Sequence, residues 1–306
     1  MRVNARHSGH VPVSAILLIV AAVGCFAVLD SIVKFLAMRY PVPLLVWARY
    51  AVQALAIVLW LGPGMRSRLL HTHQLRLQIA RGTAVLLASL CFFNALKFLP
   101  LAEATALNYT TPTLVILLSV LVLKERMTLP RWAFVAAGMV GMLLIVRPGA
   151  AILHGAALLA LGAAGFYATF QIMTRKLSTE DPRVTLFYSA LCGTVLMTLV
   201  LPFVEYRADV PWTHVALIAI MGVLGTAGHF LFILAFRHAP ASGLSPFTYM
   251  QIVWATLLGW GLFGQFPDGP ALAGMAIIAG SGLLLAWHER RRALASPQVQ
   301  EPTAVD

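Results

Sequence analysis

Residues 99–130 read LPLAEATALNYTTPTLVILLSVLVLKERMTLP, and this stretch decides the fold. It is long and apolar enough to cross a bilayer, for which a helix needs roughly 20 apolar residues. Two residues inside it are unusual for a membrane span, the carboxylate Glu103 and the proline Pro112. The stretch then ends in the charged turn Lys124-Glu125-Arg126. It therefore predicts a transmembrane helix that carries a charge and is interrupted near its middle.

The same pattern recurs in the second half of the chain. With a shift of 140 residues, Tyr109 aligns with Tyr249 and Pro130 aligns with Pro270, without a gap. The start of each half repeats too, because residues 24–36 resemble residues 165–177 at an offset of 141. Glu103 has no acidic counterpart, since Gly243 takes its place. The repeat indicates a duplicated fold whose two halves differ in their charged residues.

The composition is that of a membrane protein. Of the 306 residues, 60% are hydrophobic and only 11% are charged, against about 25% charged residues in a typical soluble domain. Ten apolar runs fill nearly the whole chain, at residues 14–37, 43–61, 79–97, 101–122, 130–147, 155–176, 183–203, 212–236, 240–264 and 270–288. The sequence therefore predicts an all-α integral membrane protein with ten transmembrane helices and no separate soluble domain.

Ten helices in two similar halves place five helices in each half. Because five is odd, the second half enters the membrane from the opposite side, which is the inverted-repeat arrangement of many secondary transporters. The expected boundaries are a cytoplasmic N-terminus at residues 1–13, a first repeat at 14–148, a second repeat at 154–288 and a disordered cytoplasmic tail at 289–306.

The net charge of +11 is best explained as an orientation signal rather than as a nucleic-acid surface. If the N-terminus is cytoplasmic, 16 of the 22 Lys and Arg residues fall on that side, Arg81 among them, and four on the other. Lys and Arg are enriched in cytoplasmic loops of membrane proteins. We therefore expect a multi-pass protein of the inner (plasma) membrane with both termini in the cytoplasm.

Charged residues inside spans are the candidates for function, because a charge at the membrane centre is costly and is normally paired or faces water. Asp30 and Lys34 are four residues apart on one helix face, in the order that favours an ion pair. Two interpretations stay open, a structural ion-pair network or a substrate site and outer gate. The candidate substrate-binding and translocation residues are Asp30, Lys34, Arg49, Asn94, Glu103, Tyr109, His229, Tyr249, Gln251 and Trp254.

Prolines inside spans are candidate hinges. Pro112, among three threonines, and Pro246, in the matched helix, each remove a backbone donor and crowd the carbonyl four residues earlier. They serve either as hinges of a rocking motion or as static kinks. No metal or cofactor site is predicted, because His71 and His73 lack further ligands and the three cysteines show no CxxC spacing.

Several motifs resemble the EamA-type transporters of the drug/metabolite transporter superfamily. They are Asp30-Ser-Ile-Val-Lys34, the run from Pro100 to Ala106, the turn Lys124-Glu125-Arg126, and the Arg147-Pro-Gly end of the first half. The resemblance covers residues 14–288 and implies export or uptake of amino acids, cofactors or vitamin-like compounds. Gln265 stands where this family usually has Glu, which implies that symmetry at this position is dispensable.

The predicted function is secondary-active or facilitative transport of a small organic metabolite by alternating access. The expected partners are this substrate, membrane lipid and protons as candidate coupling ions, without nucleic acid, in a monomer or weak homodimer. A membrane-embedded enzyme is the alternative from another class, but no HExxH, GxSxG or Walker-type motif occurs. A channel-like facilitator is the third alternative, which would show flux without saturation.

Overall fold

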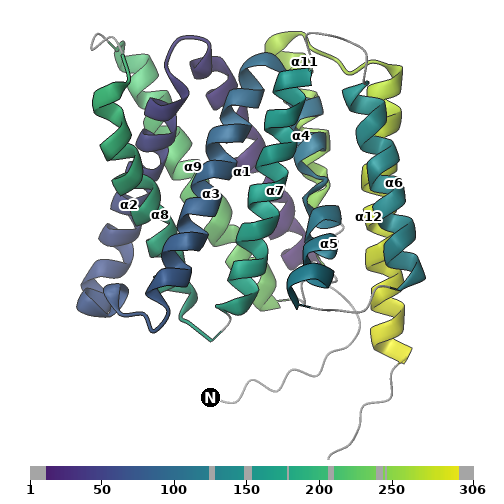
Figure 1. Cartoon of the computed structure of the whole chain (residues 1–306). Helices are drawn as coiled ribbons and strands as arrows, with labels where there is room; N and C mark the ends of the chain where they lie inside the picture. Colours follow the sequence, from purple (N-terminus) through teal and green to yellow (C-terminus); the bar gives the residue numbers. More distant parts are fainter. Residues whose placement is uncertain are drawn as a thin grey trace, which may run out of the picture.

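The structure is a computed structural model, which describes residues 12–123, 128–147, 154–177, 179–205, 210–238, 244 and 247–295. Every regular element in this part of the chain is helical (Figure 1). The helices stand side by side, with the start of α1 and the end of α12 at the same end of the bundle.

The helices follow the apolar runs closely. They are α1 (Val13–Ala37), α2 (Val42–Met65), α3 (Leu75–Phe98), α4 (Leu101–Asn108), α5 (Thr111–Leu123), α6 (Leu129–Val146), α7 (His154–Lys176), α8 (Pro182–Val200), α9 (Trp212–His238), α11 (Met250–Phe263) and α12 (Gly269–Ala295), with short 3₁₀ turns η1 (Arg66–Leu70) and η2 (Leu201–Phe203). Seven of them, α1, α2, α3, α7, α8, α9 and α12, are long and apolar enough to cross a membrane. The protein is therefore a multi-pass membrane protein.

The interruption expected at Pro112 is present. The predicted fourth span is split into α4, which ends at Asn108, and α5, which begins at Thr111. Pro112 has no N–H for the carbonyl of Asn108, and the Thr111 hydroxyl donates to that carbonyl instead, at 2.6 Å. The Thr110 hydroxyl donates to the Leu107 carbonyl at 2.7 Å, in addition to the Thr110 backbone N–H. The matched Pro246 lies outside the described residues, and so does the Lys124-Glu125-Arg126 turn.

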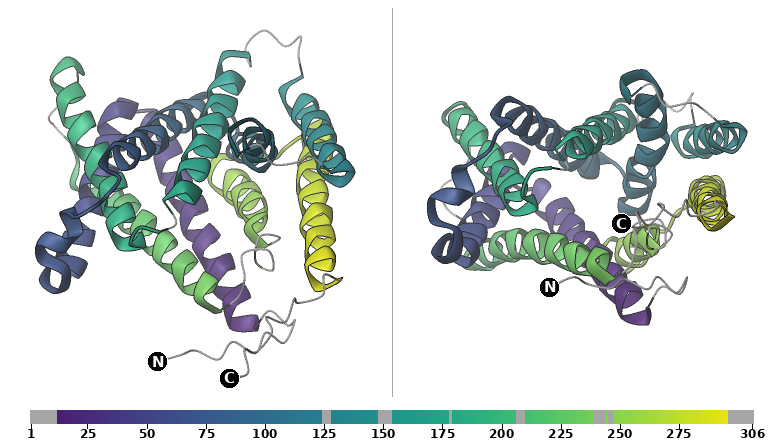
Figure 2. Two further views of the ribbon diagram at one scale, coloured as in Figure 1. Left: turned by 60° about the horizontal axis from the view of Figure 1, so that its bottom comes forward. Right: turned by 90° about the horizontal axis from the view of Figure 1, so that it is seen from below.

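The helices pack mainly across the two halves of the chain. The main contacts pair α1 with α9, α3 with α7, α2 with α8, and α6 with α12, and further contacts pair α2 with α9, α3 with α8, α1 with α11, α5 with α7, and α4 with α11. The pair α6–α12 forms one edge of the bundle in Figure 1, and both views of Figure 2 agree. The main core cluster runs through α1, α2, α3, α4 and α7 and holds the large side chains Tyr50, Phe93 and Leu107.

Two glycines, Gly141 and Gly274, bring α6 and α12 into close contact. A Cβ on Gly141 would lie 2.8 Å from the carbonyl oxygen of Gly274, and a Cβ on Gly274 would lie 2.6 Å from that of Gly141. Close approach of backbones at small residues is the common way for helices to pack in lipid.

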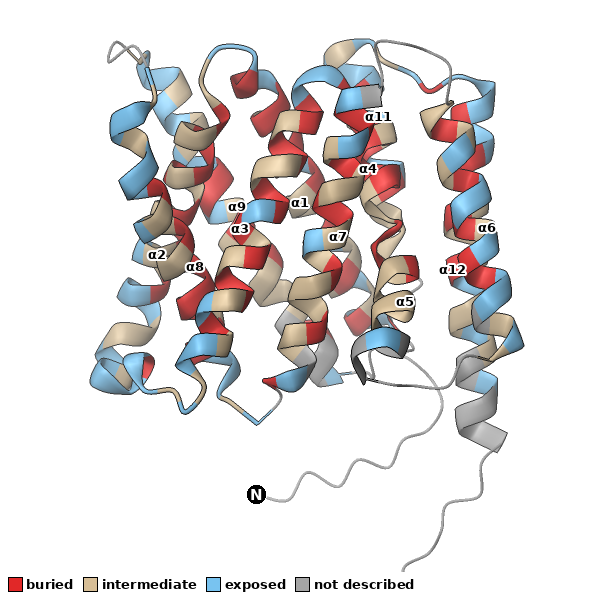
Figure 3. Cartoon of the chain, in the orientation of Figure 1, coloured by how far each residue is buried: buried red, intermediate tan, exposed pale blue. Residues whose placement is uncertain are grey.

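Exposed residues lie on the outward faces of the helices, where a bilayer would lie (Figure 3), and many of them are large and apolar. Trp60, Leu121 and Leu284 are more than half exposed. At the C-terminal end α12 continues to Ala295, past residue 288, where the second repeat is expected to end. Arg291 stacks on the Trp287 ring one turn earlier, with 3.8 Å between Cζ and the ring centroid, which favours helix over disorder here.

Candidate translocation site

A chain of hydrogen bonds links three of the predicted residues across the two halves of the protein. The Gln251 side-chain amide donates to the Asp30 carboxylate, with 3.2 Å between Nε2 and Oδ2. Its carbonyl oxygen accepts a hydrogen bond from the Tyr109 hydroxyl at 3.1 Å. Asp30 is only 6% exposed, so this polar network is buried inside the bundle.

The network sits where two helices begin or end. Tyr109 is the C-cap residue of α4, at the break before α5, and Tyr249 is the N-cap residue of α11. Their rings lie 5.1 Å apart. The Tyr109 hydroxyl has one proton, which it shares between the Gln251 side-chain oxygen at 3.1 Å and the Thr248 carbonyl at 2.6 Å. The break in the fourth span is thus tied directly to the start of α11. Gln251, in the first turn of α11, is held at the same level as Asp30 on α1.

Arg49 approaches the same region from α2. It is half-buried, and its guanidinium donates to the Ser89 hydroxyl at 3.2 Å and lies 4.5 Å from the Tyr50 ring centroid. Its positive charge interacts electrostatically with Asp30 of α1 and with His229 of α9. Arg49 and Asp30 do not form an ion pair, because none is recorded between these two described side chains within 4.0 Å. The site therefore holds a cation and an anion that face a common region.

Lys34 does not pair with Asp30 as the sequence predicts. Its ammonium group donates to the carbonyls of Leu96 and Leu99, at 3.0 and 2.6 Å, and lies 5.6 Å from the Phe263 ring centroid. These carbonyls are at the C-terminal end of α3, where backbone acceptors lack helical partners and the helix dipole favours a cation. Lys34 thus joins the end of α1 to the end of α3, and the expected ion pair is a wrong prediction.

Glu103 lies in the first turn of α4, near an ion pair at the same end of the bundle. The Arg147 guanidinium donates to the Asp268 carboxylate, joining the end of α6 to the start of α12. This hydrogen bond lowers the pKa of Asp268 and raises the pKa of Arg147, and the charge of Glu103 also raises the pKa of Arg147. Asp268 caps α12 as well, by accepting from the Ala271 N–H at 3.1 Å.

Three other predicted residues, His229, Asn94 and Trp254, make no recorded hydrogen bond to this network in the described part of the chain. The His229 ring makes an edge contact with Phe26 at 5.1 Å, and Asn94 donates to the carbonyl of Leu90 on its own helix. Trp254 is 36% exposed and packs on α1 beside Gly24. Pro246, the second predicted hinge, lies outside the described residues.

Arg81 on α3 is a buried cation, which the sequence analysis counted only as one of the basic residues of the cytoplasmic side. It is 6% exposed and donates to the hydroxyls of Thr174 and Ser189, both at 2.6 Å, and to the Thr185 carbonyl at 3.0 Å. Its guanidinium stacks on Phe170, 4.3 Å from the ring centroid. Arg81 thus joins α3 to α7 and α8. The sequence did contain a signal, because Arg81 lies inside the predicted span 79–97.

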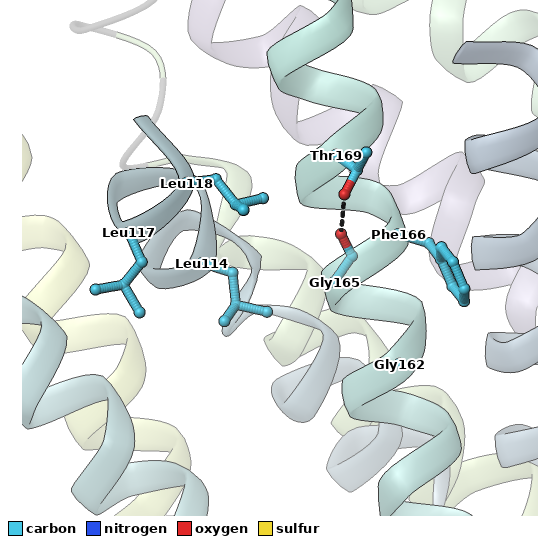
Figure 4. A pocket seen from close by; sticks show the side chains of 7 residues that line it. All are labelled: Leu114, Leu117, Leu118, Gly162, Gly165, Phe166 and Thr169. Carbon is cyan, nitrogen blue, oxygen red and sulfur yellow. Dashed lines mark hydrogen bonds between the residues drawn. The ribbon is translucent and has the colours of Figure 1, made fainter. Parts of the chain in front are cut away.

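A separate apolar groove of about 400 Å³ lies between α5 and α7 (Figure 4). Leu114, Leu117 and Leu118 of α5 line one side of the groove, and Gly162, Gly165 and Phe166 of α7 line the other. Its only polar lining side chain is Thr169, whose hydroxyl donates to the Gly165 carbonyl at 3.0 Å. The groove offers no charged group, so the candidate site is the network around Asp30 and Arg49.

Comparison with known proteins places these features in a family. The model of a family described as the EamA-like transporter family matches the chain twice, over residues 13–147 and 154–287. A solved crystal structure has a TM-score of 0.63 and 21% identity, and the match covers 93% of this chain and 99% of that one. This likeness shows a shared fold.

Three relatives have names that state a transported compound. A riboflavin transporter of Vibrio cholerae is 27% identical, with 92% of this chain and 96% of the relative covered. An S-adenosylmethionine uptake transporter of Rickettsia conorii is 25% identical, with 72% and 75% covered. The pseudopaline exporter CntI of Pseudomonas aeruginosa is 27% identical, with 87% and 93% covered. All three names describe small-molecule transport.

Proposed function

The chain belongs to the EamA-like transporter family and is a transporter of small metabolites or cofactors; on that premise we propose that it works by alternating access between two inverted five-helix repeats. The observation that carries this proposal is the buried network in which Asp30 and Tyr109 of the first half meet Gln251 of the second. Substrate sites of such carriers lie near the midplane, at the interface of the repeats, and are formed by interrupted helices.

The packing of the helices supports the duplication. In the repeat, α1, α2 and α3 correspond to α7, α8 and α9, and α6 corresponds to α12. Exchanging the halves converts the contact of α1 with α9 into that of α7 with α3, and the contact of α2 with α9 into that of α8 with α3. The pairs α2–α8 and α6–α12 map onto themselves. The main contacts between the halves are thus those expected of a pseudo-two-fold axis.

The direction of the helices supports the inversion. Lys34, near the end of α1, bonds to carbonyls at the end of α3, so α1 and α3 run the same way. Arg81, near the start of α3, bonds to Thr174 near the end of α7, so α3 and α7 run in opposite directions. The first helix of the second half therefore runs against the first helix of the first half, which fits two units of opposed orientation.

In this proposal the break between α4 and α5 works as a hinge, together with Pro246 in the matched helix. A rocking motion of one repeat against the other would separate Tyr109 from Gln251, because these side chains lie on different repeats. We place the carrier in the inner membrane with both termini cytoplasmic, which the Lys and Arg bias supports. Asp30, the buried carboxylate of the network, is the proposed coupling site if protons drive transport.

The test uses the full chain in proteoliposomes loaded with an equimolar mixture of small metabolites. The mixture contains riboflavin, S-adenosylmethionine, amino acids and neutral sugars, and mass spectrometry follows which compounds leave the vesicles. Saturable loss of at least one compound, faster than from protein-free vesicles, is the expected result. If no compound leaves faster, or if the losses never saturate with concentration, the proposed carrier function is wrong.

A further inference from the structure

Arg49 has more hydrogen-bond donors than the protein uses. A guanidinium carries five N–H donors and no acceptor. In the described part of the chain, one recorded hydrogen bond uses them, from Nη2 to the Ser89 hydroxyl. The Nε atom is buried and has no hydrogen-bond partner there. Arg49 therefore presents donor groups, inside the bundle, that a bound molecule could satisfy.

Arg81 shows what a structural arginine looks like in this protein. Its Nε and Nη1 atoms make three recorded hydrogen bonds, to side chains or backbone of α7 and α8, and its guanidinium stacks on Phe170. Arg49 differs, because its surroundings are the aromatic faces of Tyr50 and Phe93 and a single hydroxyl. Aromatic faces orient a guanidinium without using its N–H groups. The N–H groups of the Arg49 guanidinium other than the one bonded to Ser89 thus remain available to a ligand.

The charges of the site favour an anion next to Arg49. In the whole sequence, the spans contain two carboxylates, Asp30 and Glu103, and Glu103 lies near the Arg147–Asp268 pair at the far end of α6. Asp30 is engaged by Gln251 and is beyond ion-pair distance of Arg49. A cation in a span that has no ion-pair partner in contact is costly, and a bound anion offsets that cost. Asp30 also disfavours a doubly charged group such as a phosphate monoester, through repulsion.

We propose that Arg49 binds a carboxylate of the transported molecule, so that the substrates of this protein are organic carboxylates. This inference rests on the proposed carrier function. The planar guanidinium fork matches a carboxylate in a two-bond arrangement, which a lysine cannot reproduce. The Ser89 hydroxyl, which also contacts the Tyr50 hydroxyl at 2.9 Å, holds the fork in place.

The experiment compares matched compounds that differ only in the carboxylate. Proteoliposomes of the full chain are loaded with phenylalanine and phenylalaninamide, 3-phenylpropionate and its amide, S-adenosylmethionine, riboflavin and glycerol phosphate, and efflux is followed by mass spectrometry. We expect the carboxylates to leave faster than their amides. Arg49→Gln should reduce carboxylate efflux by about tenfold to a hundredfold, the range expected for a lost charge-assisted hydrogen bond. The Arg49→Lys variant, which keeps the positive charge, should transport carboxylates faster than the Arg49→Gln variant and more slowly than wild type.

Arg183→Gln is the matched control, because it removes the same charge from an exposed position at the start of α8. It should leave the preference for carboxylates unchanged. Efflux of amides, riboflavin or the phosphate at the same rate as carboxylates overturns the inference while the carrier function stands. The inference is also overturned if the Arg49→Gln variant has the wild-type melting temperature and still transports carboxylates faster than their amides. Wild-type vesicles that release none of the compounds, nor any in the wider mixture, contradict the carrier function itself.

Discussion

Replacing Asp30 by Asn removes the negative charge of the network and keeps an oxygen atom that can accept the hydrogen bond. Asn and Asp have the same shape, and the Asn carbonyl oxygen can still accept from the Gln251 amide, now 3.2 Å away. What the variant loses is a buried negative charge. We expect Asp30→Asn to abolish transport while leaving membrane insertion and folding intact, because Asp30 is the proposed coupling site and the packing does not need its charge.

The expected change in stability is small because two effects oppose each other. A charge at the membrane centre costs about 2.5–3.5 kcal/mol on the insertion scale. A hydrogen bond to a charged group contributes about 1.5–3 kcal/mol, against about 0.5–1.5 kcal/mol for a neutral one. Asp30→Asn removes the cost and weakens the bond, so the free energy of unfolding should stay equal to wild type within about 2 kcal/mol or rise.

Gln251→Leu is the comparison variant. It removes the side-chain amide that donates to Asp30 and the side-chain oxygen that accepts from Tyr109. The Tyr109 hydroxyl keeps its hydrogen bond to the Thr248 carbonyl. An unsatisfied buried group costs about 1–3 kcal/mol, and a charged one costs more. Thermal melting in detergent should therefore rank Gln251→Leu clearly below Asp30→Asn, while transport in proteoliposomes is lost in Asp30→Asn. Full transport by Asp30→Asn, or the opposite melting order, would refute the reasoning.

Three further predictions concern the supports of the site. Gly274→Ala should lower the melting temperature, because the new Cβ lies 2.6 Å from a carbonyl oxygen of α6 and overpacking costs about 1–3 kcal/mol; Gly280→Ala, with open space around its Cβ, should not. Lys34→Met should destabilise by about 1–3 kcal/mol, because two carbonyls are left without their donor. Adding Asp30→Asn should then change the melting temperature by the same amount as it does in the wild-type protein, whereas a larger gain in the Lys34→Met protein would favour an ion pair. Asp268→Asn should lower the melting temperature at neutral pH but not in strong acid. The lowered pKa of Asp268 means that its contribution is present above the ordinary carboxyl pKa of 3.8 and is lost as pH falls through the lowered value, so an equal effect at both pH values would contradict the role of its charge.

The positions of the helices could be predicted from the sequence because they depend on local properties. Runs of apolar residues set the length of each span, and prolines and charged turns set its ends. The break at Pro112 and the close glycine contact at Gly141 follow from single residues for the same reason. None of these features requires knowing which helix lies beside which.

The directions in which side chains point could not be predicted in the same way. Most of these helices are apolar on all sides, so their sequences carry little information on which face turns inward. Asp30 and Lys34 share a face of α1 by spacing, yet one bonds to α11 and the other to the end of α3. Arg81 likewise finds its partners on α7 and α8. These outcomes depend on neighbours far away in the sequence.

Asp30 corresponds to Gln171 in the repeat, so the two halves differ in charge at this position. Where the halves agree, as at Tyr109 and Tyr249, the two residues meet each other at the interface. At Asp30, where they differ, the charged residue of the first half meets the neutral Gln251 of the second. A symmetric pair of carboxylates at this depth would repel each other and double the cost of burying charge. A single carboxylate opposite Arg49 instead leaves the shared scaffold with one polar site whose chemistry can change without altering the packing of the two halves.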